Sequence, residues 1–200
     1  DMDEWYLREW AGVDPANGSP LWYTTDGNGK RTTTDSYNKA DRVYCGSAAP
    51  KFTGGWMNSF SYKGFTLTAN FDFVYGNLLY NQSRELLDSD GAYADYNSMK
   101  LKSGWKRWEK EGDIATHPKA INGGNKNSNK SSSRYLEKGN YFSLRNLSLG
   151  YSIPEKLCGK LGLQRVNVSC SADNLFTLTP FSGVSPQLSD SSTDGYAGTI

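Results

Sequence analysis

The sequence lacks any long apolar run. No stretch approaches the roughly 18 consecutive apolar residues that a membrane-spanning helix needs. The first ten residues, DMDEWYLREW, also lack the basic and apolar regions of a signal peptide. A helical membrane protein is therefore excluded. A transmembrane β-barrel is not, because its strands alternate apolar and polar side chains and average to a polar sequence.

Cysteine and histidine are scarce. The three cysteines, Cys45, Cys158 and Cys170, are too few and too far apart for a disulfide framework or a paired-cysteine zinc site. The single histidine, His117, lies in a polar segment with no companion at metal-ligand spacing. We interpret it as an exposed loop residue. The sequence predicts no metal and no cofactor.

Charge of one sign is not in excess either. The chain has 22 basic and 21 acidic residues and a net charge of +1, without long blocks of one sign, so nothing indicates a nucleic-acid partner. The stretch Asp88-Ser89-Asp90-Gly91, with Asp95 after it, has the look of a calcium loop but lacks the third ligand and the final glutamate of an EF-hand. A solvated turn is the simpler interpretation, and calcium stays the alternative.

Aromatic residues and glycine are plentiful, with 13 Tyr, 8 Phe, 6 Trp and 21 Gly. In residues 64–75, GFTLTANFDFVY, apolar and polar side chains alternate, which predicts a strand with one apolar and one polar face. Residues 54–62 alternate in the same way, and only Lys63-Gly64 separates the two runs. A tight antiparallel hairpin is the expected structure. Alternation returns in residues 141–153 and 165–178, which predicts two further strands.

Connections between these strands alternate between short and long. They comprise residues 63–64, 76–134 and 154–164, and residues 179–200 form an open-ended loop. Antiparallel neighbours put alternate connections at opposite ends of a sheet, and outer-membrane barrels have short periplasmic turns and long extracellular loops. The sequence thus predicts an all-β fold, with about four antiparallel strands of a transmembrane β-barrel in residues 54–178.

Three regions are predicted to lie on the extracellular side. Residues 1–53 are rich in turn formers and are expected to be a loop region with small hairpins, including short strands in residues 5–10 and 21–25. Residues 76–134 form a long extracellular loop with short helices predicted in 82–87 and 97–109, and its mobile part is expected in 123–133. Residues 179–200 form an extracellular loop before a missing last strand.

Five segments resemble one family in family order. They are WAGVDPANGSPLWY (10–23), GSAAPKFTGGWMNSFSYKGFTL (46–67), RWEKEGDIATHPKA (107–120), SSRYLEKGNYFSLRNLSLGYSIP (132–154) and SADNLFTLTPFSGVSP (171–186). The chain resembles the C-terminal barrel portion of a SusC/RagA-type TonB-dependent outer-membrane transporter. The resemblance implies a Gram-negative outer-membrane barrel of about 22 strands. It also implies a SusD-like surface lipoprotein as partner and import of oligosaccharides or peptides on energy relayed by TonB. The plug that contacts TonB is expected before Asp1, and a final strand after Ile200.

Aromatic residues in the predicted loops are the candidate ligand- or partner-binding residues. They could stack on sugar rings or pack against a lipoprotein; the alternative is that they only hold their own loops together. The candidates are Trp22, Tyr23, Tyr93, Tyr96, Trp105 and Trp108.

Two other classes of protein compete with the transporter. A secreted β-sandwich that binds carbohydrate would share the aromatic content and the alternating strands, but its strands should recur every 8–12 residues or so. A hydrolase has no motif in its favour: paired carboxylates such as Glu109 and Glu111 need a defined cleft between them. No catalytic residue is predicted, and the chain is not expected to be an enzyme.

Overall fold

The computed structural model describes residues 3–93, 95–96, 99–160, 162–187 and the backbone of 196–197. The chain divides into two compact units. We call residues 50–77 and 138–181 the strand unit, and residues 1–49, 78–137 and 182–200 the loop unit. Among the described residues, no helix has the length and apolar character needed to cross a membrane.

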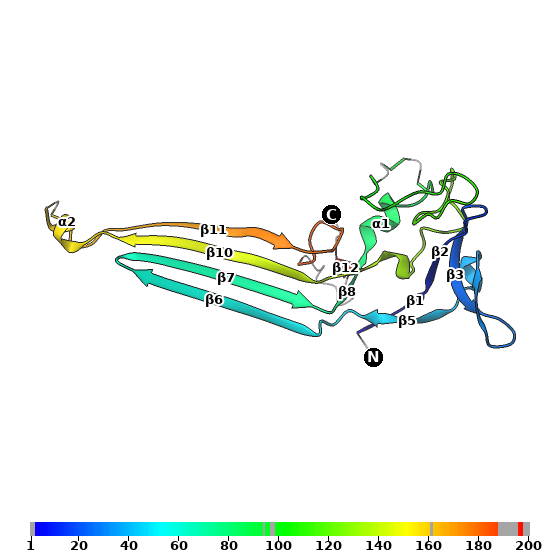
Figure 1. Ribbon diagram of the computed structural model, residues 1–200, viewed down its shortest axis with the longest axis horizontal. Coiled ribbons are helices and arrows are strands. Elements are labelled where there is room, and N and C mark those ends of the chain that lie inside the picture. The colour runs from blue at the N-terminus through cyan, green and yellow to red at the C-terminus, as the bar shows by residue number, and fades with distance from the viewer. Residues whose placement is uncertain (1–2, 94, 97–98, 161, 188–195, 198–200) are drawn as a thin grey trace. The chain divides into compact units, whose positions relative to one another are not determined.

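The strand unit is one antiparallel sheet in the order β11-β10-β7-β6. Its strands are long and lie side by side in Figure 1: β6 (Phe52–Tyr62), β7 (Phe65–Tyr75), β10 (Tyr141–Ser152) and β11 (Asn167–Leu178). Each is 11 or 12 residues long, which suits a tilted strand that crosses a bilayer. All four predicted strands are confirmed, with ends within about two residues of those expected.

The turn between β6 and β7 consists of Lys63 and Gly64 alone. Both residues have positive φ, 47° and 88°, as a two-residue turn of type I′ requires. Gly64 has a second reason to be glycine, because a Cβ there would lie 2.8 Å from the carbonyl oxygen of Ser152. The tight turn fixes the register of the hairpin, which runs from Tyr62 opposite Phe65 to Phe52 opposite Tyr75.

The register of the strands places apolar side chains on one face of the sheet and polar side chains on the other. On one face Phe71 lies opposite Trp56, and Leu67 lies between Phe60 and Leu149. On the other face Thr68 lies between Ser59 and Ser148. The apolar face is largely exposed, with Trp56 at 62% and Phe60 at 64% of full exposure. A β-sandwich would bury this face against a second sheet, so the exposure argues against the sandwich alternative.

A bulge interrupts the alternation in β10. Leu144 pairs with Phe71 and Phe176, but the next paired residue is Asn146, so Arg145 has no direct partner. On β11 the irregularity falls at Asn174, whose φ is 52°. The Arg145 guanidinium donates to the Asp72 carboxylate at 2.9 Å. The bulge therefore keeps the leucines on the apolar face and lets an arginine reach the polar face.

The connection from β10 to β11 carries a helix that the sequence did not predict, α2 (Glu155–Lys160). Pro154 precedes it, and the amides of Leu157 and Cys158 donate to the Pro154 carbonyl at 2.9 and 3.2 Å. Like the Lys63-Gly64 turn, this connection joins adjacent strands. At the opposite end of the sheet, β6 begins at Phe52, β7 ends at Tyr75, β10 begins at Tyr141 and β11 ends at Leu178.

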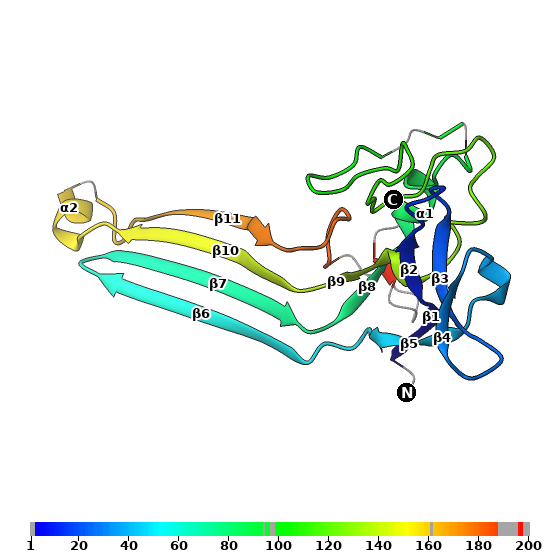
Figure 2. The ribbon, with the colours of Figure 1, turned by 45° about the vertical axis from the view of Figure 1, so that its right-hand side comes forward.

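The loop unit contains short strands in three small sheets (Figures 1 and 2). β1 (Glu4–Arg8) pairs with β5 (Arg42–Ser47), and β3 (Pro20–Thr25) pairs with β2 (Trp10–Val13) and β4 (Arg31–Thr34). β8 (Leu78–Asn81) lies between β9 (Leu136–Lys138) and β12 (Tyr196–Ala197). The loop unit also contains the helix α1 (Gln82–Leu87) and two short 3-10 helices, Tyr37–Lys39 and Ser133–Tyr135.

One of the two helices predicted in the long loop is confirmed and one is wrong. α1 matches the prediction for residues 82–87. The described part of the second, residues 99–109, is not helical, and residues 97–98 lie outside the described part of the chain. The amides of His117 and Trp108 instead donate to the carbonyls of Lys106 and His117, both at 3.0 Å. Pairing with this later segment takes the backbone groups that a helix would use.

Candidate functional site

A cluster of charged side chains, most of them buried, joins distant segments of the loop unit. We call Arg84, Asp88, Asp90, Arg107 and Arg134 the arginine–aspartate cluster. α1 positions its first members, since Arg84 lies four residues before Asp88 and donates to it at 3.0 Å. Arg84 also reaches Glu137 at 3.0 Å. Both side chains of the first pair are under a tenth exposed, which is unusual for charged groups unless they are paired.

Asp90 is the centre of this cluster. Its fully buried carboxylate accepts from Arg107 at 2.6 Å and from the Ser128 hydroxyl at 2.7 Å. Arg134, 44 residues further along the chain, donates to both of its oxygens. The φ of Asp90 is 52°, a left-handed conformation that aspartate tolerates better than most residues. The carboxylate therefore joins three segments of the long loop.

His117 lies in the same region, where burial contradicts two predictions. It is 2% exposed, its Nε2 lies 2.9 Å from Asp88 Oδ2, and its Nδ1 lies 2.8 Å from the Thr116 hydroxyl. The prediction of an exposed loop histidine is therefore wrong. The prediction of a solvated turn at Asp88 and Asp90 is wrong as well, because each is 2% exposed.

Electrostatics keep Asp88 charged. Burial opposes its ionisation, but the hydrogen bond with His117 and the positive charges of Arg134 and Arg84 outweigh burial and lower the pKa of Asp88 below its usual value. For Arg134, burial is likewise outweighed by the negative charges of Asp90 and Asp88, and its pKa is raised. The carboxylates thus have arginine partners, and the described residues contain no group of three or more His, Cys, Asp or Glu placed to hold a metal ion.

Beside the cluster lies a hollow of about 310 Å³, which we call the tyrosine hollow. Arg107, 27% exposed and held by the fully buried Asp90, contributes its charged part, and apolar side chains that include Leu86 and Met99 contribute the rest. Tyr93 and Tyr96 line it with rings 5.5 Å apart and are 42% and 57% exposed. Exposed aromatic rings next to fixed charged groups are suited to bind an amphipathic ligand or a protein side chain.

The other four predicted aromatic residues are engaged within the loop unit. Trp22 is fully buried between Trp10 and Tyr37, with ring centroids 5.6 and 5.5 Å away. Tyr23 lies under the Arg31 guanidinium at 3.7 Å. These contacts give both side chains a structural role, so their burial and stacking do not support a role in binding.

The two tryptophans of the long loop, Trp105 and Trp108, are also engaged in contacts within the loop unit. Trp108 is 8% exposed, and its indole donates to the Pro15 carbonyl at 2.9 Å. Trp105 is half-buried, with the Arg84 guanidinium 4.4 Å from its ring and the His117 ring 4.9 Å away. Of the six predicted residues, the structure therefore brings only Tyr93 and Tyr96 together on an open surface. Their role in binding stays a prediction.

Comparison with known proteins identifies the relatives of the chain. It is 33% identical over 177 residues to TonB-dependent receptor P3 of Formosa agariphila, covering 87% of this chain and 16% of the relative. It is 31% identical over 151 residues to TonB-dependent receptor P39 of the same organism, covering 74% of this chain and 14% of the relative. The chain thus spans about a sixth of the length of these relatives. No family model matches the sequence.

Solved structures that are similar to this chain are transporters as well. The RagAB peptide transporter matches with a TM-score of 0.73 and 28% identity, over 92% of this chain and 20% of that one. The RagAB peptide importer in its open-open state matches with a TM-score of 0.73 and 27% identity, over 91% and 19%. The resemblance inferred from the sequence is confirmed. Over most of its length the chain is similar to part of the TonB-dependent receptors and of the RagAB transporter, and its antiparallel strands are those of a partial transmembrane β-barrel.

Proposed function

We propose that the protein containing this chain imports a solute across the outer membrane with energy relayed by TonB. The observation that carries the proposal is the similarity to TonB-dependent receptor P3 over 87% of the chain. The strand unit supports it physically, because its polar face carries Thr, Ser, Asn and Asp side chains, as suits a water-filled lumen. Known relatives are receptors and transporters, which fits a protein without catalytic residues.

The proposed orientation puts the loop unit outside the cell. The two connections at one end of the sheet, residues 63–64 and 153–166, are short, and outer-membrane barrels keep short turns in the periplasm. The loop unit connects to the opposite strand ends. Residues 1–53, 76–134 and 179–200 then belong to the extracellular side, where a SusD-like lipoprotein and the solute would approach.

The solute is proposed to be an oligosaccharide or a peptide. The solved relative is a peptide transporter, while the family resemblance also allows glycans. In the loop unit, Tyr93 and Tyr96 are the best-placed residues to contact either the solute or the lipoprotein, because they are exposed beside a hollow with an arginine, Arg107, that Asp90 holds in place. Loops anchored on a rigid barrel can bind a ligand without disturbing the fold.

Replacing Tyr93 and Tyr96 together by alanine is the test of this surface. We expect capture of the lipoprotein or uptake of the solute to fall by about thirtyfold or more, since two aromatic hot spots that each contribute on the order of 1–2 kcal/mol are removed together. Co-purification from membranes and uptake of labelled peptides and oligosaccharides by cells making the full-length protein would measure the two effects. Loss of uptake in cells without TonB tests the energy source.

A matched control is available in the same unit. Tyr6 and Tyr44 are also an exposed aromatic pair, with rings 5.1 Å apart and exposures of 52% and 65%, but they lie on β1 and β5 away from the tyrosine hollow. Alanine at both should leave capture and uptake at wild-type levels. If the two double variants behave alike, Tyr93 and Tyr96 have no specific binding role.

A further inference from the structure

The tyrosine hollow exposes a positive charge and buries the negative one. Arg107 and Asp90 both line it, and their side chains are 27% and 0% exposed. Among the residues that adjoin the lining in the chain, exposed lysines outnumber exposed acids. They are Lys100, Lys102, Lys106 and Lys119 against Asp95, with Lys106 paired to Asp113. The charge that a ligand meets in this hollow is therefore positive.

The hydrogen-bond donors of this charge are only partly used. Both hydrogen bonds that Arg107 donates to described residues come from Nη1, to Asp90 at 2.6 Å and to the Pro118 carbonyl at 3.0 Å. Its Nη2 lies 3.8 Å from Asp88 Oδ1, beyond hydrogen-bond distance. Ser89 also lines the hollow and is 7% exposed, and its hydroxyl has no hydrogen-bond partner in the described part of the chain. Because Ser89 directly precedes Asp90, the unused donors lie close together.

Most of the remaining lining is apolar or aromatic. It includes Leu86, Leu87, Met99, Leu101, Tyr93 and Tyr96. The volume of about 310 Å³ is near the lower limit for ligand pockets, about 300 Å³. The hollow therefore suits a single amino-acid residue better than an extended oligosaccharide.

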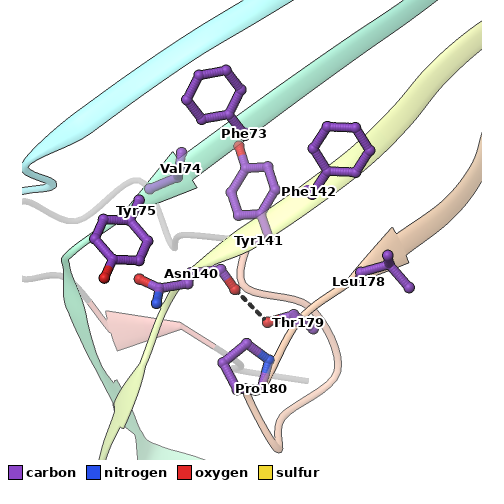
Figure 3. Close-up of a pocket in the computed structure, with 9 residues that line it drawn as sticks. All are labelled: Phe73, Val74, Tyr75, Asn140, Tyr141, Phe142, Leu178, Thr179 and Pro180. Atoms are coloured by element: carbon purple, nitrogen blue, oxygen red, sulfur yellow. Dashed lines mark hydrogen bonds between the residues drawn. The ribbon is translucent and has the colours of Figure 1, made fainter.

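A hollow in the strand unit lacks this combination (Figure 3). None of the nine residues that line it is charged, and the side chains of Phe73, Phe142 and Leu178 make it apolar. The Thr179 hydroxyl already donates to the Asn140 carbonyl at 2.8 Å, which is the dashed line in Figure 3. That hollow offers an anion no positive charge, whereas the tyrosine hollow does.

We propose that the tyrosine hollow binds the C-terminal residue of a peptide, with the carboxylate on Arg107 and Ser89 and the side chain among the apolar lining. A guanidinium and a hydroxyl match the acceptors of a carboxylate. A chain end carries its carboxylate and side chain on one carbon, so one small hollow holds both. An internal acidic residue would need an exit for the chain on both sides. The inference rests on the proposed function, since it takes the imported solute to be a peptide.

Binding of matched peptides to the purified full-length transporter tests the proposal. Isothermal titration calorimetry should show Gly-Gly-Gly-Leu binding about tenfold or more tightly than its C-terminal amide, because the amide loses the charge-assisted hydrogen bonds. Gly-Glu-Gly-Leu amide, which carries an internal carboxylate, should bind as weakly as the first amide. Equal affinity for acid and amide, no binding of any peptide, or binding of a galacturonate trimer in place of the peptides would overturn the proposal.

Two variants locate the preference in the hollow. Arg107→Lys keeps the charge that pairs with Asp90 but loses the planar fork, and Ser89→Ala loses only the hydroxyl, so each should reduce the preference for the acid. Ser103→Ala is the matched control, because Ser103 is exposed and outside the hollow. A wild-type preference in all three variants would contradict the assignment. Binding is measured without uptake, so a transporter that prefers the acid but imports nothing would contradict only the proposed function.

Discussion

Replacing Asp90 with asparagine is expected to destabilise the loop unit by about 3–5 kcal/mol, the typical cost of removing one partner from a buried ion pair. The substitution keeps the shape of the side chain and tolerates the positive φ of residue 90, so it removes mainly the charge. Arg107 and Arg134 would then share a site that has lost its central carboxylate.

Hydrogen exchange of the full-length protein measures this effect directly. Amides of residues 84–137 should exchange about a hundredfold faster or more, since every 1.4 kcal/mol or so is a factor of ten. Asp35→Asn is the control, because the ion pair of Asp35 with Lys126 is about half exposed. Its loss should cost at most about 1 kcal/mol. Similar exchange in both variants would mean that the buried cluster does not hold the loop unit together.

The second large effect is expected at Phe71. Arginine in its place should cost about 2–4 kcal/mol if the side chain faces the bilayer near its midplane. Phe71 lies in the middle of β7 and packs against Trp56 and Phe142, at 5.8 and 5.4 Å between ring centroids. A charge here would be placed in hydrocarbon and would also disturb this aromatic row.

Thr68→Arg is the matched variant on the opposite face. Thr68 also lies in the middle of β7, but its cross-strand neighbours are Ser59 and Ser148, so its side chain faces the polar side. A refolding titration of the full-length protein into lipid vesicles should show a loss of stability for Phe71→Arg and little change for Thr68→Arg. Equal losses would contradict the assignment of the two faces.

The strands could be predicted from the sequence because the alternation that marks a strand is visible in residues that are close together in the chain. Alternation of apolar and polar side chains sets which face each residue takes, and the Lys63-Gly64 turn sets the register of the first hairpin. The bulge in β10 also has a signal in the sequence. Leu144 and Leu147 lie on the same face although they are three positions apart, an odd spacing that breaks the alternation. The prediction of a helix in residues 97–109 was wrong because the backbone of residues 106–108 pairs with residues 116–117, which overrides the local pattern.

The arginine–aspartate cluster could not be predicted in the same way. Its main pairs join residues far apart in the sequence, such as Asp90 with Arg134, and no local pattern specifies them. The only signal was Arg84 and Asp88 at helical spacing. For that reason the sequence indicated a solvated turn where the structure has buried charges. The same limit applies to Trp22 and Trp108, whose burial depends on partners such as Tyr37 and Pro15.

Labelling of single cysteines in intact cells tests the central claim, that the four strands cross the outer membrane with the loop unit outside. The native cysteines of the full-length protein would be replaced, and a cysteine introduced at Asn28, in an exposed turn of the loop unit, or at Lys63, in the turn between β6 and β7. A membrane-impermeant maleimide should label Asn28→Cys in intact cells and Lys63→Cys only after the outer membrane is opened. Labelling of Lys63→Cys in intact cells would contradict the account.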